Sequence, residues 1–105
     1  MATATNGWLQ QDLTATGAGA DVLQIRAPVG AKFPLRGTLW VTGTFVGTLV
    51  LEGSAPGDSS WGVVSGTSVT TPTSLSITIA APEDLRFNVT AYTSGTLSAK
   101  LHVMI

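Results

Sequence analysis

Apolar and polar residues alternate one by one along several stretches of the chain. The clearest are residues 21–27, 74–80, 85–92 and 97–105, each with apolar residues two positions apart. A period of two predicts β-strands with one buried face, and no stretch shows the period of an amphipathic helix. Glycine, proline, serine and aspartate separate these stretches and mark turns. The pattern predicts an all-β fold, an antiparallel β-sandwich or jelly-roll-like barrel of about eight short strands.

The apolar stretch at residues 36–61 is predicted to form a β-hairpin followed by a polar loop. Strand-forming residues lie on both sides of Gly43, and glycine accepts the positive φ that a tight turn needs. A two-residue loop pairs Val41 with Val46, whereas a three-residue loop exchanges the faces of the second strand. Both faces carry large apolar side chains in either register. One face should enter the core, and the other should meet loops of the same chain, a partner chain or a sugar.

Two further turns are predicted downstream of this hairpin. Residues 56–58 form the tip of a polar loop that leads to a short strand within residues 60–65. Residues 93–95 form a three-residue hairpin loop between the last two strands. Gly95 then occupies the position of that loop that requires a left-handed conformation.

The length of 105 residues corresponds to one domain. Residues 1–7 lack a regular apolar pattern and predict a flexible N-terminal arm. Residues 8–105 are predicted to form a single β-sandwich domain. Such a chain buries about two thirds of its unfolded surface, which is enough for an independent but marginal core.

Charge and cysteine content exclude several classes of function. Charged residues make up 10% of the chain and the net charge is −1, whereas a nucleic-acid-binding domain carries a basic patch or stripe. No apolar run has the roughly 20 residues of a membrane span. The first residues lack the basic and apolar regions of a signal peptide. The absence of cysteine excludes disulfides and thiolate metal sites, and fits a reducing compartment.

Low charge also predicts how the surface is used. Isolated β proteins protect their sheet edges with lysine, proline or bulges, and this chain has only two lysines, Lys32 and Lys100. A surface so neutral is poorly defended against association. It favours a protein whose surface is normally occupied by neighbouring chains. The alternative is a monomer with an exterior rich in threonine and serine.

The sequence predicts no catalytic residue, no metal site and no cofactor, and hence no enzyme. His102 is the only histidine, and a metal site or a nucleophile–base pair needs further partners. Glu52 and Asp58 flank one loop and could form a glycosidase pair only if they faced each other across a cleft. Loop solubility and turn hydrogen bonds explain these carboxylates better.

Aromatic residues are the remaining candidates for binding. Trp61 is expected in the core, where it would close the loop against the hairpin, and Trp40 is expected to anchor an interface. In the two-residue register Trp40 would cover Gly47 on the opposite strand. The residues predicted at a protein interface are Trp40, Phe45, Val46, Trp8 and Tyr92. The alternative is a carbohydrate-binding module that stacks sugars on Trp40, Trp61 and Tyr92.

Two motifs resemble known proteins. Residues 54–61 resemble a degenerate Asp box, the turn of sialidase-like repeats, which supports a strand–turn–strand structure and no sialidase activity. Residues 43–54, Trp61 and residues 87–96 together resemble small β-sandwich proteins from the structural cassettes of tailed bacteriophages. The usual pattern carries acidic and arginine-rich positions around the turn and late strand, which are mostly neutral in this chain.

The phage resemblance implies a virion component. It would be a capsid decoration (cement) protein on the capsid surface, made in the host cytoplasm, with the major capsid protein as its partner. Proteins of this kind are often trimers, and the N-terminal arm would reach a neighbouring subunit. The alternative is a tail, baseplate or head–tail adaptor component. Neither a nucleic acid nor a membrane is expected as a partner.

Overall fold

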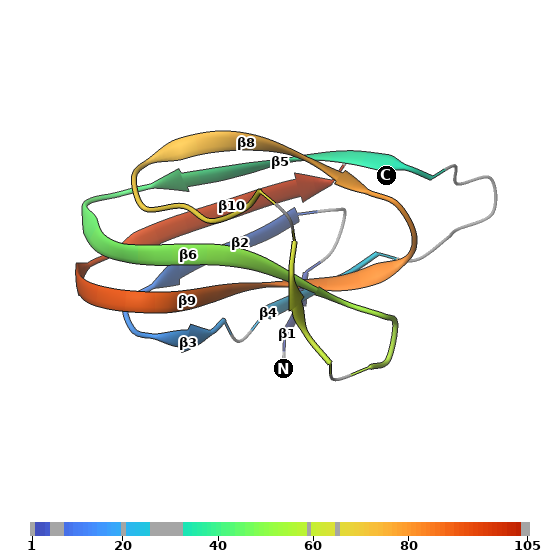
Figure 1. Cartoon of the computed structure of the whole chain (residues 1–105), viewed down its shortest axis with the longest axis horizontal. Coiled ribbons are helices and arrows are strands. Elements are labelled where there is room, and N and C mark those ends of the chain that lie inside the picture. Colours follow the sequence, from blue (N-terminus) through green and yellow to red (C-terminus); the bar gives the residue numbers. More distant parts are fainter. Residues whose placement is uncertain are drawn as a thin grey trace.

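Two β-sheets pack face to face to form the domain (Figure 1). The computed structural model describes residues 2–4, 8–19, 21–25, 33–58, 60–64 and 66–103, and for residues 2–4 the backbone alone. Sheet A contains, in spatial order, β1 (Ala2–Ala4), β4 (Asp21–Ile25), β9 (Glu83–Gly95), β6 (Phe45–Ser54) and β7 (Gly62–Val63), with β3 (Gly17–Ala18) also paired to β9. Sheet B contains β2 (Trp8–Leu13), β10 (Leu97–Val103), β5 (Leu35–Thr42) and β8 (Thr73–Ile79).

The predicted all-β sandwich is therefore confirmed. The described residues form ten strands rather than about eight, because three of them have only two or three residues. All pairings between these strands are antiparallel except that of β1 with β4. None of the described residues forms a helix long and apolar enough to cross a membrane.

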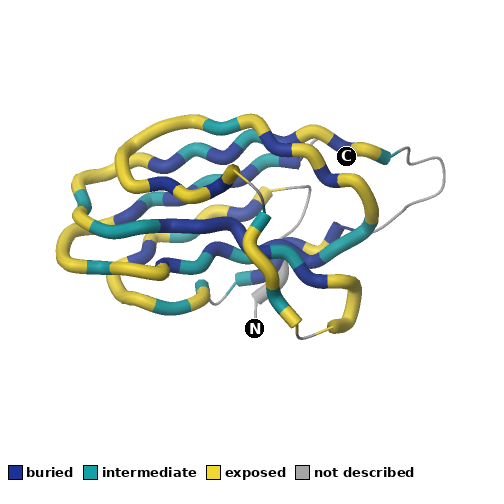
Figure 2. Tube along the Cα trace, viewed as in Figure 1, coloured by how far each residue is buried: buried dark blue, intermediate teal, exposed yellow. Residues whose placement is uncertain are grey.

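The alternation in the sequence is visible as alternating burial along the strands (Figure 2). In β10, every second residue from Leu97 to Val103 is buried, as the pattern predicted. The inward side chains of the two sheets meet in one core, and each large one contributes about 1.5–3 kcal/mol by leaving water. The largest fully buried side chains are Phe87, Leu9, Leu23, Ile25, Leu39, Leu49, Leu51, Ile79, Leu85, Leu97, Leu101 and Val41.

The predicted hairpin at residues 36–61 was wrong. β5 and β6 do not pair, because the chain crosses from sheet B to sheet A at Gly43. A flat hairpin would have left one of its two apolar faces in water. The crossing instead lets Leu39 and Val41 of β5 enter the core from one sheet while Leu49 and Leu51 of β6 enter it from the other. Neither register predicted for the hairpin applies.

The predicted hairpin around residues 93–95 was also wrong, and for the same reason. β9 lies in sheet A and β10 in sheet B, so the chain changes sheets between Gly95 and Leu97. Both crossings lie side by side at the left end of the domain in Figure 1.

One antiparallel ladder consequently continues through both sheets. In sheet B, β5 pairs with β10 up to Thr42 opposite Ser98. In sheet A, β6 pairs with β9 from Phe45 opposite Gly95, in the same register. The ladder bends over the end of the core between these two pairs.

Two glycines make this bend possible. Gly43 and Gly95 have φ values of +103° and +88°, which side-chain-bearing residues rarely adopt. A Cβ on Gly95 would overlap the backbone oxygen of Thr44, and a Cβ on Gly43 would overlap that of Thr96. A hydrogen bond also joins the two crossings, because the amide of Thr96 donates to the backbone oxygen of Thr44 at 3.0 Å. The prediction of a left-handed glycine at position 95 is confirmed.

The segment between β6 and β8 covers the free edge of β6. It begins as the predicted strand–turn–strand, in which the amide of Asp58 donates to the oxygen of Ala55 at 2.9 Å around a left-handed Gly57. Further along, Val69 exchanges two backbone hydrogen bonds with Leu49 of β6. In the other sheet, β8 is an edge strand that pairs with β5 on one side and with no described strand on the other.

Some of the sequence predictions lie outside the described residues. These concern Met1 and residues 5–7 of the arm, residues 26–32 and the last two residues of the chain. Within the predicted arm, residues 2–4 form β1 and pair with β4 at the edge of sheet A. The flexibility of the arm stays a prediction.

Candidate functional site

The outer face of sheet B carries the most distinctive cluster of side chains. The inward residues of β2, β10 and β5 fill the core, so the residues between them project outward. Strand register then brings outward residues together from three strands distant in sequence. Trp8 lies opposite His102, and Lys100 lies between Gln10 and Trp40.

Three aromatic rings of this face form a stack. The ring centroids of Trp8 and Trp40 are 6.2 Å apart, with ring planes within 15° of parallel. The imidazole of His102 lies 4.2 Å from the Trp8 ring at an angle of 29°. The ammonium of Lys100 lies 5.8 Å from the centroid of Trp8, within range of a cation–π interaction. Trp8 remains 42% exposed.

An open groove of about 610 Å³ runs over these residues. Its walls combine the two indoles with hydrogen-bonding side chains. The lining residues are Trp8, Gln10, Asp12, Trp40, Thr42, Ser98, Ala99 and Lys100. The hydroxyl of Ser98 donates to Oδ1 of Asp12 at 2.9 Å and orients that carboxylate. We define this set as the tryptophan groove.

The chemistry of the tryptophan groove is that of binding. It offers aromatic faces, donors from Lys100 and Gln10, and acceptors from Asp12 and Gln10. In the described part of the chain, no group of three or more histidine, cysteine, aspartate or glutamate residues could hold a metal ion.

The five residues predicted at an interface do not form one cluster. The structure brings Trp8 and Trp40 together on sheet B. Phe45, Val46 and Tyr92 lie on sheet A near the bend, where Val46 is 58% exposed and the two aromatic residues pack against the core. The Tyr92 hydroxyl donates to the oxygen of Gly95 at 2.6 Å, so it supports the bend.

The predicted pairing of Trp40 with Gly47 was wrong, since Trp40 lies between Lys100 and Ser74. This follows from the crossing at Gly43, which moves Gly47 into sheet A. The described part of the N-terminal arm pairs with β4 in the other sheet. Trp40 contacts Trp8 instead.

Trp61 is not a core residue, contrary to the prediction. It is half-buried beside sheet A, and the guanidinium of Arg86 lies 4.2 Å from its ring centroid. Arg86 also pairs with Glu52 of β6, with 2.9 Å between Nε and Oε1. The amide of Asn88 donates to Oε2 of Glu52 at 3.0 Å. These polar contacts hold the loop against sheet A. The pattern of apolar residues could not predict them.

This geometry argues against two functional alternatives drawn from the sequence, the sugar platform and the glycosidase pair. Trp40 is on sheet B, whereas Trp61 and Tyr92 belong to the sheet A side, so these three residues do not form one sugar platform. Glu52 is engaged with Arg86 and Asn88. Asp58 accepts the amide of Ser60 at 3.1 Å within the turn. Both carboxylates therefore make contacts that stabilise the fold.

Burial perturbs one further carboxyl group. Glu83 begins β9, and its carboxylate lies 3.2 Å from the position that a Cβ of Gly53 would occupy. Desolvation by burial raises the pKa of Glu83 above its ordinary value of 4.5. Glu83 lies outside the tryptophan groove, so its raised pKa affects the stability of the fold and not binding in the groove.

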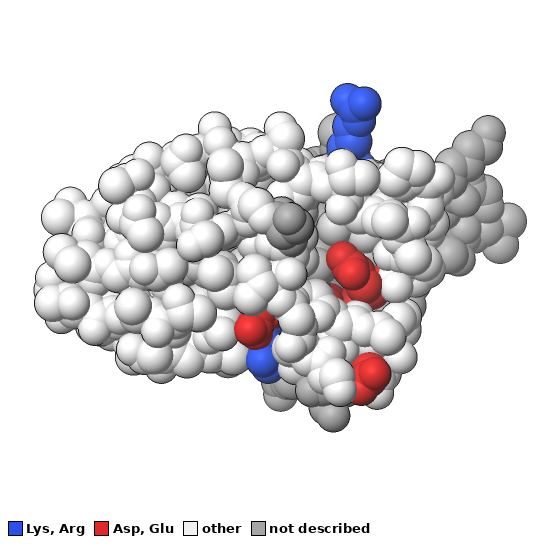
Figure 3. All heavy atoms as spheres, viewed as in Figure 1, with Lys and Arg blue, Asp and Glu red and all other residues white. Residues whose placement is uncertain are grey.

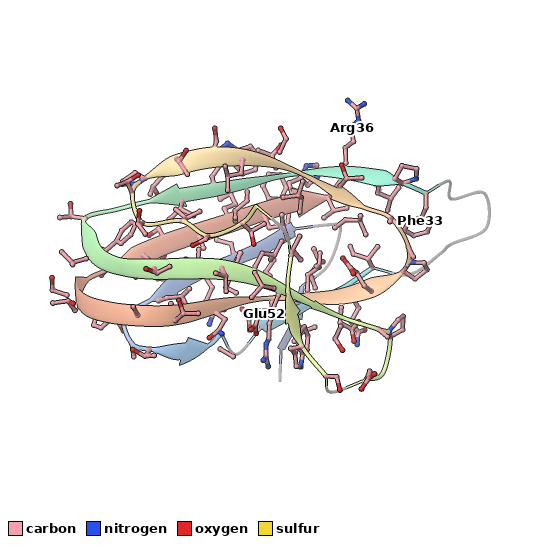
Figure 4. The ribbon with its side chains drawn as sticks, viewed as in Figure 1. Phe33, Arg36 and Glu52 are labelled. Carbon is pink, nitrogen blue, oxygen red and sulfur yellow. The ribbon has the colours of Figure 1, made fainter. Side chains whose placement is uncertain are left out.

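The edge strand β8 is a second candidate surface. It is seven residues long, contains no charged residue and no proline, and pairs only with β5 among the described strands. Ser74, Ser76 and Thr78 are exposed on it. Arg36 is the only charged residue on the neighbouring β5 and points away from the domain (Figure 4). The face formed by β6, β8 and β9 carries few charged side chains (Figure 3).

Sequence reasoning missed the polar members of the groove. Gln10, Asp12, Ser98 and Lys100 alternate with apolar residues, and this pattern placed them on an outward face. Their meeting with Trp40 depends on β10 lying between β2 and β5. That order could not be read from the chain.

No protein-family model matches the sequence, and a search of curated proteins also finds no match.

Proposed function

We propose that this protein is a structural component of a bacteriophage virion, of the capsid decoration (cement) type. It binds the outer surface of the shell of major capsid protein and stabilises the shell. The resemblance of residues 43–54, Trp61 and residues 87–96 to phage structural proteins gives the class of assembly. The observation that carries the proposal is the open, uncharged edge strand β8.

An edge strand of this kind favours pairing with another chain. A strand exposes the backbone N–H and C=O groups of alternate residues along its free side, about three or four residues in a strand of this length. Free edges in monomeric proteins are usually short, charged or covered. β8 is seven residues long and uncharged, and no described strand pairs with its free side. Addition of a partner strand would satisfy its backbone groups and give a contact independent of side-chain charge.

The rest of the proposal follows from this mode of contact. Copies of the chain also associate with one another on the shell, as a trimer, and the role needs neither catalysis, nucleic acid nor a membrane. The site of action is the capsid surface, after synthesis in the host cytoplasm. The neutral exterior of 10% charged residues suits close contact with neighbouring subunits.

Binding to empty shells tests the proposal. Purified protein is mixed with shells of the major capsid protein encoded in the same genome, and bound protein is measured by co-sedimentation. We expect saturable binding of hundreds of copies per shell and a higher melting temperature of the decorated shell. Absence of binding at saturating concentration would contradict the proposal. A dozen copies or fewer per virion would instead support a tail or head–tail adaptor.

A charge on the edge tests the proposed contact. Ser76 is exposed at the middle of β8, so Ser76→Lys places a lysine on the edge without entering the core. We expect it to weaken shell binding about tenfold or more, because a lysine on an edge strand disfavours the addition of another strand. Thr71→Lys adds the same charge in the exposed loop before β8 and should bind normally. Equal binding by both variants would show that β8 is not the contact.

A further inference from the structure

We infer that the tryptophan groove on sheet B binds a neutral oligosaccharide. The inference concerns a different face of the domain from the free side of β8 and does not depend on the virion assignment. It is carried by the aromatic stack, by the hydrogen-bonding walls of the groove and by its charge balance.

The aromatic stack provides the apolar part of such a site. Trp8 and Trp40 come from two strands separated by β10, yet their ring planes lie within 15° of parallel at 6.2 Å. His102 stacks on Trp8 and Lys100 lies near the same ring, so contacts on two sides restrict its orientation. The C–H face of a pyranose ring packs on the electron-rich face of an indole. Trp8 keeps 42% of its surface exposed beside this stack, so ring surface is available for a sugar unit.

The remaining walls suit the hydroxyl groups of a sugar. The carboxylate of Asp12 and the amide of Gln10 accept hydrogen bonds, whereas Lys100 and the hydroxyl of Thr42 donate them. Asp12 is already held by Ser98 at 2.9 Å. A ligand that presents hydroxyl groups can use both kinds of partner. The groove volume of about 610 Å³ lies within the roughly 300–1,000 Å³ that is typical of small-ligand sites.

Charge and composition argue against other occupants. Lys100 and Asp12 balance each other, so the groove lacks the positive field that single-stranded nucleic acid requires besides aromatic stacking. Apart from its tryptophans, this groove is lined by polar residues and one alanine. The balance favours a neutral, hydroxyl-rich ligand.

Calorimetry with defined sugars tests the inference. The full chain is titrated with β-linked hexasaccharides of glucose, N-acetylglucosamine, mannose and galactose, and with polygalacturonate and oligo-dT as charged probes. We expect saturable binding of at least one neutral hexasaccharide. Trp40→Ala and Trp8→Ala should each weaken it about tenfold or more. Trp61→Ala removes a tryptophan outside the groove and should leave the affinity unchanged.

Further variants keep the test decisive if a tryptophan variant unfolds. Gln10→Ala removes one amide from the groove, and Trp40→Phe retains a smaller ring. Both should fold as judged by circular dichroism and weaken binding by about threefold to tenfold. The inference is overturned if no neutral hexasaccharide binds the folded protein, if only the charged probes bind, or if binding is equally strong in the folded groove variants.

Discussion

Substitution of Gly95 by alanine should destabilise the domain strongly. Gly95 has a φ of +88°, and a left-handed conformation costs an alanine about 1–2 kcal/mol. The added Cβ would also overlap the backbone oxygen of Thr44 and lie 2.7 Å from the Cα of Phe45. Relief of this overlap requires a backbone shift of the kind that costs about 1–3 kcal/mol. The sum is about 3 kcal/mol, a large part of the 5–15 kcal/mol typical of a domain.

Gly57→Ala is the matched control. Gly57 has a similar φ of +77°, but a Cβ there would meet nothing within 4 Å. It should cost only the conformational part, about 1–2 kcal/mol. The difference in the free energy of unfolding between the two variants therefore measures the steric cost of a Cβ at the bend.

Urea unfolding monitored by circular dichroism measures both costs. With an m-value of about 1–3 kcal/mol/M, we expect Gly95→Ala to lower the midpoint by roughly 1–3 M, about twice the effect of Gly57→Ala. Each of the two bend glycines packs against the backbone of the other crossing. The losses of stability in Gly43→Ala and Gly95→Ala should therefore be non-additive. An equal loss of stability in Gly95→Ala and Gly57→Ala would refute the close packing of the crossings.

Two further predictions concern carboxylates of sheet A. Glu52→Gln replaces one acceptor of the contacts with Arg86 and Asn88, and should lower the free energy of unfolding by about 2 kcal/mol in urea unfolding; an unchanged midpoint would show that these contacts add nothing. Burial raises the pKa of Glu83, so its ionised form is disfavoured in the folded state above that pKa. Glu83→Gln should therefore raise the melting temperature at pH 7, with a gain that shrinks as the pH falls towards the ordinary pKa of 4.5; a gain independent of pH would contradict this cause.

The individual strands could be predicted because their burial depends on local alternation. Leu9 and Leu13 of β2, and the apolar residues of β8 and β10, lie inward as their spacing required. Turns with a specific conformational demand were also predictable. The turn at Gly57 and the left-handed Gly95 are examples, since few other residues accept those φ values.

The pairing of the strands could not be predicted in the same way. A strand that follows a short glycine-containing turn can return along its neighbour or cross to the opposite sheet, and both paths satisfy local preferences. At Gly43 the outcome depends on the whole core, because the crossing buries Leu39 and Leu49 from opposite sides. The two apolar faces of residues 36–51 were correctly recognised as incompatible with a half-exposed hairpin. The hairpin itself was wrong, because β5 and β6 belong to different sheets.

The groove and the core depend on one register. Trp40 lies opposite Lys100 in the same ladder that places Leu39 opposite Leu101. A slip by one residue would turn Trp40 inward and expose Leu39, because successive side chains point to opposite faces. The core therefore penalises shifts by an odd number of residues, which would disassemble the groove. The bend adds a second constraint, since the ladder keeps its register from Thr42 opposite Ser98 to Phe45 opposite Gly95. Selection for a stable core is thus sufficient to hold Trp8, Trp40 and Lys100 together, and what remains specific to ligand binding is the chemical identity of these outward residues.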